Sequence, residues 1–128
     1  MISKEFTCVV CPNGCSIKAA YEDTKPPKLI SAAGARCPRG EVWVRQEIEN
    51  PMRTFSTSVA VTGGEFLEAS VRLTKAVPLA KIFEIMGEIK KITLSAPLAI
   101  GDVVLKDPAG TETEVIVTRN VPQKHNNR

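Results

Sequence analysis

The chain has 128 residues, a formal net charge of +3 and 43% hydrophobic residues, with only 5% aromatic. This length accommodates one domain or two very small ones, and the composition is that of an ordinary globular protein. Basic and acidic residues are interspersed, so the sequence does not suggest a nucleic-acid-binding surface. The apolar runs are too short to cross a bilayer and no apolar signal segment follows Met1, so we expect a cytoplasmic protein without membrane insertion.

Residues 1–54 are predicted to form a small module of three strands and one helix. Turn chemistry separates the first two strands at Pro12-Asn13-Gly14, because proline fixes φ and the next two residues tolerate positive φ. The helix is amphipathic, with Val44 and Ile48 one turn apart, and Asn50-Pro51 ends it. The predicted strands cover residues 5–10, 15–21 and 28–33, and the predicted helix covers residues 41–49.

Residues 55–128 are predicted to form an α+β unit with antiparallel strands and one main amphipathic helix. The helix starts near Pro78, and its apolar face is predicted to place Phe83 and Met86 in the core. From Arg119 onward the chain is polar, so we expect a frayed tail with a solvated His125. The predicted strands cover residues 55–61 and 65–73, joined by a Gly-Gly turn, then 91–94, and then 103–106 paired with 114–118.

All four cysteines lie in the first module, at Cys8, Cys11, Cys15 and Cys37. The first three have CxxC and CxxxC spacing, and the predicted hairpin brings the fourth back beside them. Four thiolates that converge on one point are the minimum set for an all-cysteine metal site. In a reducing compartment, such a group is more typical of metal binding or catalysis than of disulfides. The sequence therefore predicts a Cys-ligated β-hairpin metal module, followed by the α+β unit.

The cysteine spacing favours a [4Fe–4S] cluster, because zinc ribbons prefer two separated CxxC pairs. Two alternatives remain open: a structural zinc site on the same cysteines, and a thiol–disulfide switch that uses Cys8 and Cys11. Arg39, which one proline separates from Cys37, is predicted to offset the charge of the cluster or to face a partner. An independent enzyme is not expected, since no acid–base pair and no nucleophile–histidine arrangement stands out.

The stretch from Cys8 to Cys37-Pro38-Arg39-Gly40, with the helix and Pro51-Met52-Arg53 after it, resembles the N-terminal [4Fe–4S] segment of molybdopterin oxidoreductases. In that family a lysine and a glycine follow the last cysteine after one residue. Arg39 keeps the charge of that lysine but not its shape. The resemblance covers residues 1–54 and implies a cluster, but no molybdenum site.

The whole chain is more similar to a family of small bacterial and archaeal proteins with CxxC pairs. The elements that carry this similarity are CPNGC, CPRG and the later APLAIGDVV. Members of that family tend to be encoded beside FAD-dependent glycerol-3-phosphate dehydrogenase-like and pyridine-nucleotide oxidoreductase-like proteins. The resemblance therefore implies an electron-transfer or accessory subunit of a flavoenzyme complex, with an FAD-dependent dehydrogenase-like protein as its partner.

Overall fold

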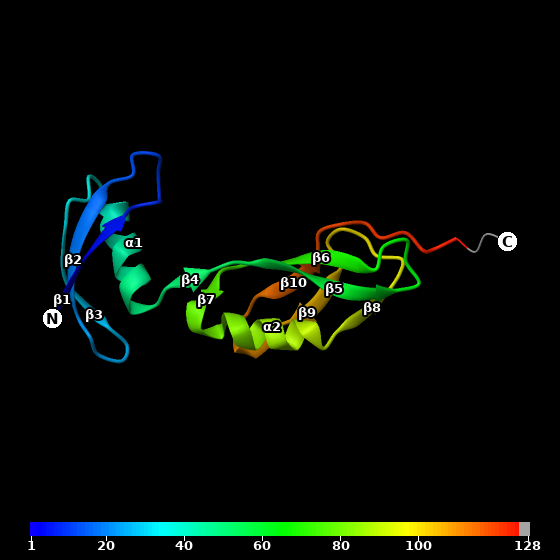
Figure 1. Ribbon diagram of the computed structural model, residues 1–128. Helices are drawn as coiled ribbons and strands as arrows, with labels where there is room; N and C mark the ends of the chain where they lie inside the picture. The colour runs from blue at the N-terminus through cyan, green and yellow to red at the C-terminus, as the bar shows by residue number, and fades with distance from the viewer. Residues whose placement is uncertain (126–128) are drawn as a thin grey trace. The chain divides into compact units, whose positions relative to one another are not determined.

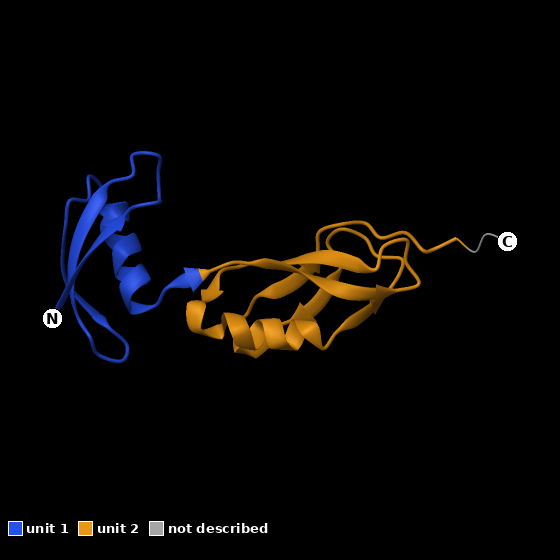
Figure 2. Cartoon of the chain, in the orientation of Figure 1, with its two compact units in different colours: residues 1–52 blue, residues 53–128 orange. Residues whose placement is uncertain are grey.

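A computed structural model of the chain describes residues 1–125. The chain divides into two compact units, residues 1–52 (unit 1) and residues 53–128 (unit 2), and each unit has its own buried core (Figure 2). Both units combine helix and strand, so the predicted α+β class is confirmed. Among residues 1–125, no helix is both long enough and apolar enough to span a bilayer.

Unit 1 is a three-stranded antiparallel sheet with one helix packed on one of its faces (Figure 1). Its elements are β1 (Ile2–Thr7), β2 (Ser16–Glu22), β3 (Lys28–Ala33) and α1 (Pro38–Glu49). The strands lie in the order β1–β2–β3, so β1 and β3 are both edge strands. Strand alternation turns Ile17 and Leu29 toward the helix, where Val44 and Ile48 complete the buried core.

Glu49 fastens α1 to the edge strand β3. Its Oε2 atom accepts a hydrogen bond from the backbone N–H of Leu29 at 3.0 Å. The same oxygen lies 3.3 Å from the guanidinium of Arg45, one helical turn earlier. Because β3 has only one neighbouring strand, a carboxylate from the helix satisfies an edge N–H that the sheet leaves unpaired.

Helix α1 begins at Pro38, three residues before the predicted start at residue 41. Proline suits the first helical position, because its fixed φ is helical and its missing N–H would have had no partner there. Cys37 consequently stands immediately before the helix, as its N-cap residue. Strand β3 has the predicted bounds, whereas β1 ends at Thr7 and leaves Cys8 in a loop.

The elements after α1 are β4 (Met52–Arg53), β5 (Ser56–Thr62), β6 (Glu68–Leu73), β7 (Val77–Pro78), the 3-10 turn η1 (Leu79–Lys81), α2 (Ile82–Lys90), β8 (Thr93–Ser95), β9 (Val103–Lys106), the turn η2 (Pro108–Gly110) and β10 (Glu114–Val117). Five of the strands form one sheet in the order β8–β5–β6–β10–β9, with α2 packed against it (Figure 1). The predicted β5–β6 and β9–β10 pairs are present. The β5–β8 pair is parallel rather than antiparallel, since β6 and α2 together form a crossover between its strands.

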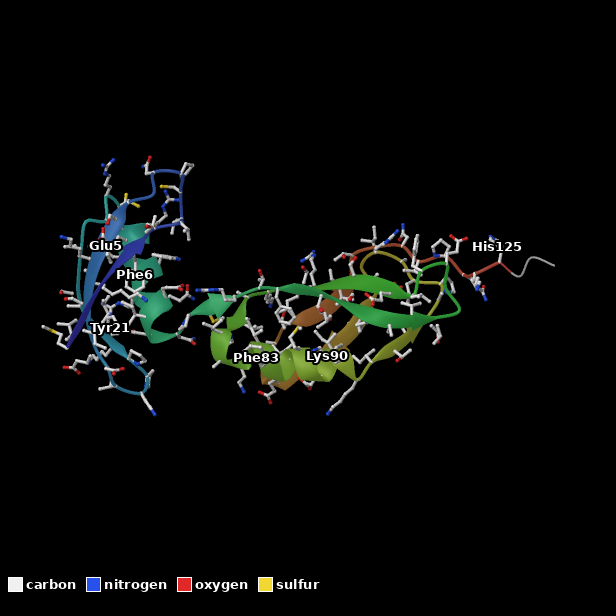
Figure 3. The ribbon with its side chains drawn as sticks, in the orientation of Figure 1. Glu5, Phe6, Tyr21, Phe83, Lys90 and His125 are labelled. Atoms are coloured by element: carbon white, nitrogen blue, oxygen red, sulfur yellow. The ribbon has the colours of Figure 1, made fainter. Side chains whose placement is uncertain are left out.

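The buried face of α2 differs from the prediction. Ile85 and Ile89 are 0% and 1% exposed, whereas Phe83, labelled on α2 in Figure 3, is 88% exposed. Residues two apart in a helix are separated by roughly 200° around the axis, so Phe83 and Ile85 point in nearly opposite directions. The prediction that Phe83 belongs to the core is therefore wrong, and Met86 is only partly buried.

The C-terminal segment is held against the rest of unit 2, where the sequence predicts a frayed tail. Val121 is fully buried, and it exchanges backbone hydrogen bonds of 2.9 Å with Leu98 in both directions. The N–H of Lys124 donates to the carbonyl of Gly63 at 2.8 Å. One buried valine thus anchors a polar segment. His125 is exposed, as expected, and residues 126–128 of the same predicted tail lie outside the described residues.

Candidate metal centre

The two segments that carry the cysteines lie at the same end of unit 1 (Figure 1). Cys8, Cys11 and Cys15 occupy the loop between β1 and β2, and Cys37 ends the connection from β3 to α1. In the sheet Thr7 pairs with Ser16, so the loop leaves and re-enters the sheet at this end. Lys18 pairs with the last residue of β3, so the connection to α1 starts beside that loop.

Cys8 lies between the base of its loop and the first turn of α1. Its N–H donates to the carbonyl of Cys15 at 2.8 Å, which closes the loop. Its side chain is buried, and the sulfur lies 3.7 Å from the position that a Cβ on Gly40 would occupy. Gly40 itself is buried in the turn that follows Cys37, so Cys8 approaches the backbone of the helix that Cys37 caps.

Gly34 sets the path of the connection that leads to Cys37. Its φ is +106°, a backbone conformation that residues with side chains rarely adopt. A Cβ at this position would also collide with the carbonyl oxygen of Ser16, the residue directly after Cys15. The connection can therefore run this close to the cysteine loop only with glycine at position 34. The cysteine spacing does not indicate a role for this glycine, although its place directly after a predicted strand is a signal for one.

We expect Gly34→Ala to destabilise unit 1 by about 1–3 kcal/mol, because the substitution adds backbone strain and a steric clash. Urea unfolding followed by the fluorescence of Trp43 measures this, since Trp43 is the single tryptophan and packs against the core of unit 1. The matched control is Gly87→Ala in α2, where an added Cβ meets nothing within 4 Å. The control should not lower the urea midpoint of unfolding. An unchanged midpoint for Gly34→Ala would mean that the close approach to Ser16 does not require a glycine at position 34.

Cys37 has an environment that stabilises its thiolate. The backbone N–H groups of Gly40 and Arg39 face its sulfur and lower the pKa of the thiol below its ordinary value. The guanidinium of Arg39 acts in the same direction by hydrogen bonding and by its charge, while partial burial acts against it. The thiolate is the form that attacks disulfides and binds metals, so these groups favour the metal-binding form of Cys37.

The pH dependence of alkylation tests this environment. A lowered pKa keeps the thiolate present at lower pH, so the rate of reaction of Cys37 with iodoacetamide should have its midpoint below that of a cysteine blocked at both its amino and carboxyl groups. Arg39→Ala should raise this midpoint only partway, because the backbone N–H groups are the larger cause. Peptide mapping of metal-free protein by mass spectrometry gives the rates. A midpoint at or above that of the free thiol would refute the stabilisation.

An aromatic pair packs behind the cysteine end. The rings of Phe6 and Trp43 meet edge to face, with centroids 6.4 Å apart and an interplanar angle of 82°. Both side chains pack against the buried cluster that contains Cys8, and Cys15 packs against it as well; Figure 3 labels Phe6 on β1. The two rings and Cys15 therefore pack against the same buried cluster that contains Cys8.

The four cysteines are the side chains at this end that could hold a metal. All four are free thiols, with Cys8 buried and the other three partly exposed. Within residues 1–125, no three His, Cys, Asp or Glu side chains lie close enough together to hold a metal ion. The donor set nevertheless fits a tetrathiolate centre in its chemistry, because it offers four sulfurs from two adjacent segments, together with N–H groups that favour a thiolate at Cys37.

Comparison with known proteins gives a family and a fold. Residues 38–119 match the family model described as "Protein of unknown function (DUF1667)", and this segment begins directly after Cys37. The NMR structure of Clostridium perfringens protein CPE0013 is similar, with a TM-score of 0.53, 22% identity, and coverage of 60% of this chain and 92% of that one. At this identity the likeness shows the fold alone. No curated protein matches the chain. The matched segment spans more than half of the sequence, and the chain belongs to the DUF1667 family.

Proposed function

We propose that this chain is an iron–sulfur electron carrier or accessory subunit, in which Cys8, Cys11, Cys15 and Cys37 ligate a [4Fe–4S] cluster. The observation that carries the proposal is the placement of both cysteine-bearing segments at one end of unit 1, with Cys8 against the helical turn that follows Cys37. The cysteine spacing and the resemblance to [4Fe–4S] segments of molybdopterin oxidoreductases support a cluster over a single metal ion.

Each neighbouring group has a role in this proposal. A bound cluster supplies one-electron chemistry, and the chain's own residues hold it and adjust its surroundings. The N–H groups of Arg39 and Gly40 stabilise negative charge on the Cys37 sulfur. The guanidinium of Arg39 offsets part of the negative charge of a four-thiolate cluster, which raises its reduction potential. Phe6 and Trp43 add apolar bulk to the cluster that buries Cys8, which would limit the access of water from the core side.

The proposed partner is a flavin-dependent dehydrogenase or oxidoreductase. This part of the proposal comes from the resemblance to the family of small CxxC-containing proteins, whose members tend to be encoded beside such flavoproteins. A flavin accepts or donates single electrons, so a one-electron carrier is chemically suited to it. Electron transfer between two proteins requires no substrate pocket on the carrier, in keeping with a sequence that shows no acid–base pair.

A structural zinc site on the same cysteines is the second candidate. It is favoured by the burial of Cys8, which packs with Ile17 and Val44 in the core of unit 1. A metal ion held there would join the β1–β2 loop to the start of α1 and stabilise the unit. A thiol–disulfide switch of Cys8 and Cys11 has weaker support. Cys8 is only 5% exposed, so a thiol of another molecule would have difficulty reaching its sulfur for exchange.

Spectroscopy of anaerobically purified protein separates these candidates. An electron carrier should be brown, with a broad visible absorption that dithionite bleaches and an EPR signal that appears on reduction. A zinc module should be colourless, unresponsive to dithionite, and unfolded by a chelator. A colourless protein with stoichiometric zinc would overturn the iron–sulfur proposal.

A further inference from the structure

We propose that two copies of this chain pair through the outer edge of β3, about a two-fold axis, so that their unit 1 sheets join into one continuous antiparallel sheet. The α1 helices of the two copies then lie side by side and antiparallel on one face of that sheet. The pairing requires no metal, so it stands independently of the proposed function. We call the pairing surface the β3 edge and define it by residues 30–33 together with Glu41, Val42 and Arg45 of α1.

Strand β3 differs from the other edge strands in its length and charge. It has six residues, and the only charged one is the first, Lys28. The other edge strand of unit 1, β1, carries Lys4 and Glu5 near its centre, and the edge strands β8 and β9 of the five-stranded sheet have three and four residues. Charged side chains and short length are common features that keep an edge from pairing with a further strand. After its first residue, β3 has neither feature.

A groove of about 350 Å³ lies between this edge and α1, and exposed apolar side chains line it. Ile30 on the strand side is 50% exposed, and Val42 on the helix side is 69% exposed. Because Glu49 already accepts the N–H of Leu29, a second strand can pair only along residues 30–33. A strand added there would cover both apolar side chains with those of the other copy.

The register between α1 and β3 places Val42 at the level of Ala32. The connection of residues 34–37 turns the chain back, and the hydrogen bond between Glu49 and Leu29 sets those two residues at one level. Ala32 lies three strand residues beyond Leu29, and Val42 lies seven helical residues before Glu49, which is roughly 10 Å in both cases. A two-fold axis through Ala32 therefore passes near Val42, and the two Val42 side chains meet across it.

The charges around the groove fit a second copy better than a strongly charged partner. Glu41 and Glu49 balance Arg45 and Lys28. Glu41 and Arg45 lie on opposite sides of Val42 along the helix, so the two-fold axis brings Glu41 of each copy toward Arg45 of the other. Arg45 contacts Glu49 through one nitrogen at 3.3 Å, and its guanidinium has further N–H groups for a second carboxylate. The surface is therefore complementary to itself in charge.

Sedimentation velocity of anaerobically purified, full-length protein tests the pairing, in the presence of a reductant so that no disulfide joins the copies. At about 200 μM the wild type should sediment as a dimer, because a dimer with a micromolar dissociation constant is then almost fully formed. Val42→Asp should weaken dimerisation about tenfold or more, since it places two carboxylates against each other at the axis. Glu41→Lys should weaken it as well, because it sets like charges against Arg45 of the other copy. The matched control Leu67→Asp introduces the same charge at an 84% exposed position in unit 2 and should leave dimerisation unchanged.

Hydrogen exchange identifies the strand that pairs. The amides of residues 30–33 that face the outer edge should exchange about tenfold more slowly in the wild-type dimer than in monomeric Val42→Asp. Far-UV circular dichroism of this variant tests for loss of fold, and Glu41→Lys gives a second monomeric reference.

A monomer at this concentration would overturn the proposal and leave the β3 edge to a strand of a different protein. A dimer that Leu67→Asp weakens as much as Val42→Asp, or a dimer without slowed exchange in residues 30–33, would overturn the assigned surface. A dimer with slowed exchange there, in a protein that holds zinc and no cluster, would keep the pairing and remove the electron carrier.

Discussion

Replacing Cys37 with serine is expected to lower the iron and acid-labile sulfide content of anaerobically purified protein roughly tenfold or more. The chain has four cysteines in total, so no other thiol can take the vacated position. A serine oxygen is a harder ligand than a thiolate and a poor substitute at an iron–sulfur cluster. The visible absorption should disappear together with the iron.

The matched control for this variant is Ala33→Ser, which adds a hydroxyl group four residues earlier, at the exposed end of β3. It should keep the iron content and the colour of the wild type. Far-UV circular dichroism of both variants tests for loss of fold. If a folded Cys37→Ser variant kept its full iron content, Cys37 would not be a ligand and the four-cysteine site would be wrong.

Replacing Ile85 with alanine is expected to destabilise unit 2 by about 2–5 kcal/mol, because it leaves a cavity beneath α2. Ile85 is fully buried and belongs to the core that includes Val71 and Val115. Phe83→Ala, two residues earlier in the same helix, removes a larger side chain that is 88% exposed. That change should alter the free energy of unfolding by only about 0.5 kcal/mol.

Urea denaturation followed by far-UV circular dichroism measures both variants. The comparison is informative because residue size alone would rank them in the opposite order. A larger loss of stability for Phe83→Ala than for Ile85→Ala would mean that the other face of α2 covers the sheet.

Local patterns in the sequence predicted the element types well. Strand β3 has the predicted bounds, because polar turn residues precede it and Gly34 follows it. The β9–β10 pair follows from two short apolar runs on either side of Asp107-Pro108. In each case the information lies within a few neighbouring residues.

Non-local features could not be predicted in the same way. Helix α2 carries two overlapping apolar stripes, one through Phe83 and one through Ile85, and periodicity alone does not say which of them meets the sheet. The parallel β5–β8 pair depends on a crossover, and the C-terminal segment is attached by the burial of Val121 and by backbone hydrogen bonds to distant residues such as Gly63. These outcomes are decided by which surfaces meet in the folded unit.

The candidate site also has some features that the local sequence predicts and others that depend on tertiary packing. The spacing of the cysteines identified all four candidate ligands, and the hairpin pattern placed their two segments at one end of the module. The positive φ of Gly34 and its approach to Ser16 are properties of tertiary packing. Cys37 is the N-cap residue because α1 starts at Pro38. Proline at the first helical position signals this start, whereas the apolar periodicity places the start of the helix three residues later.

The iron, acid-labile sulfide and zinc content of the anaerobically purified full-length protein tests the central claim most directly. A [4Fe–4S] cluster on Cys8, Cys11, Cys15 and Cys37 predicts about four iron atoms and about four sulfides per chain, without stoichiometric zinc. Stoichiometric zinc with no acid-labile sulfide would contradict it.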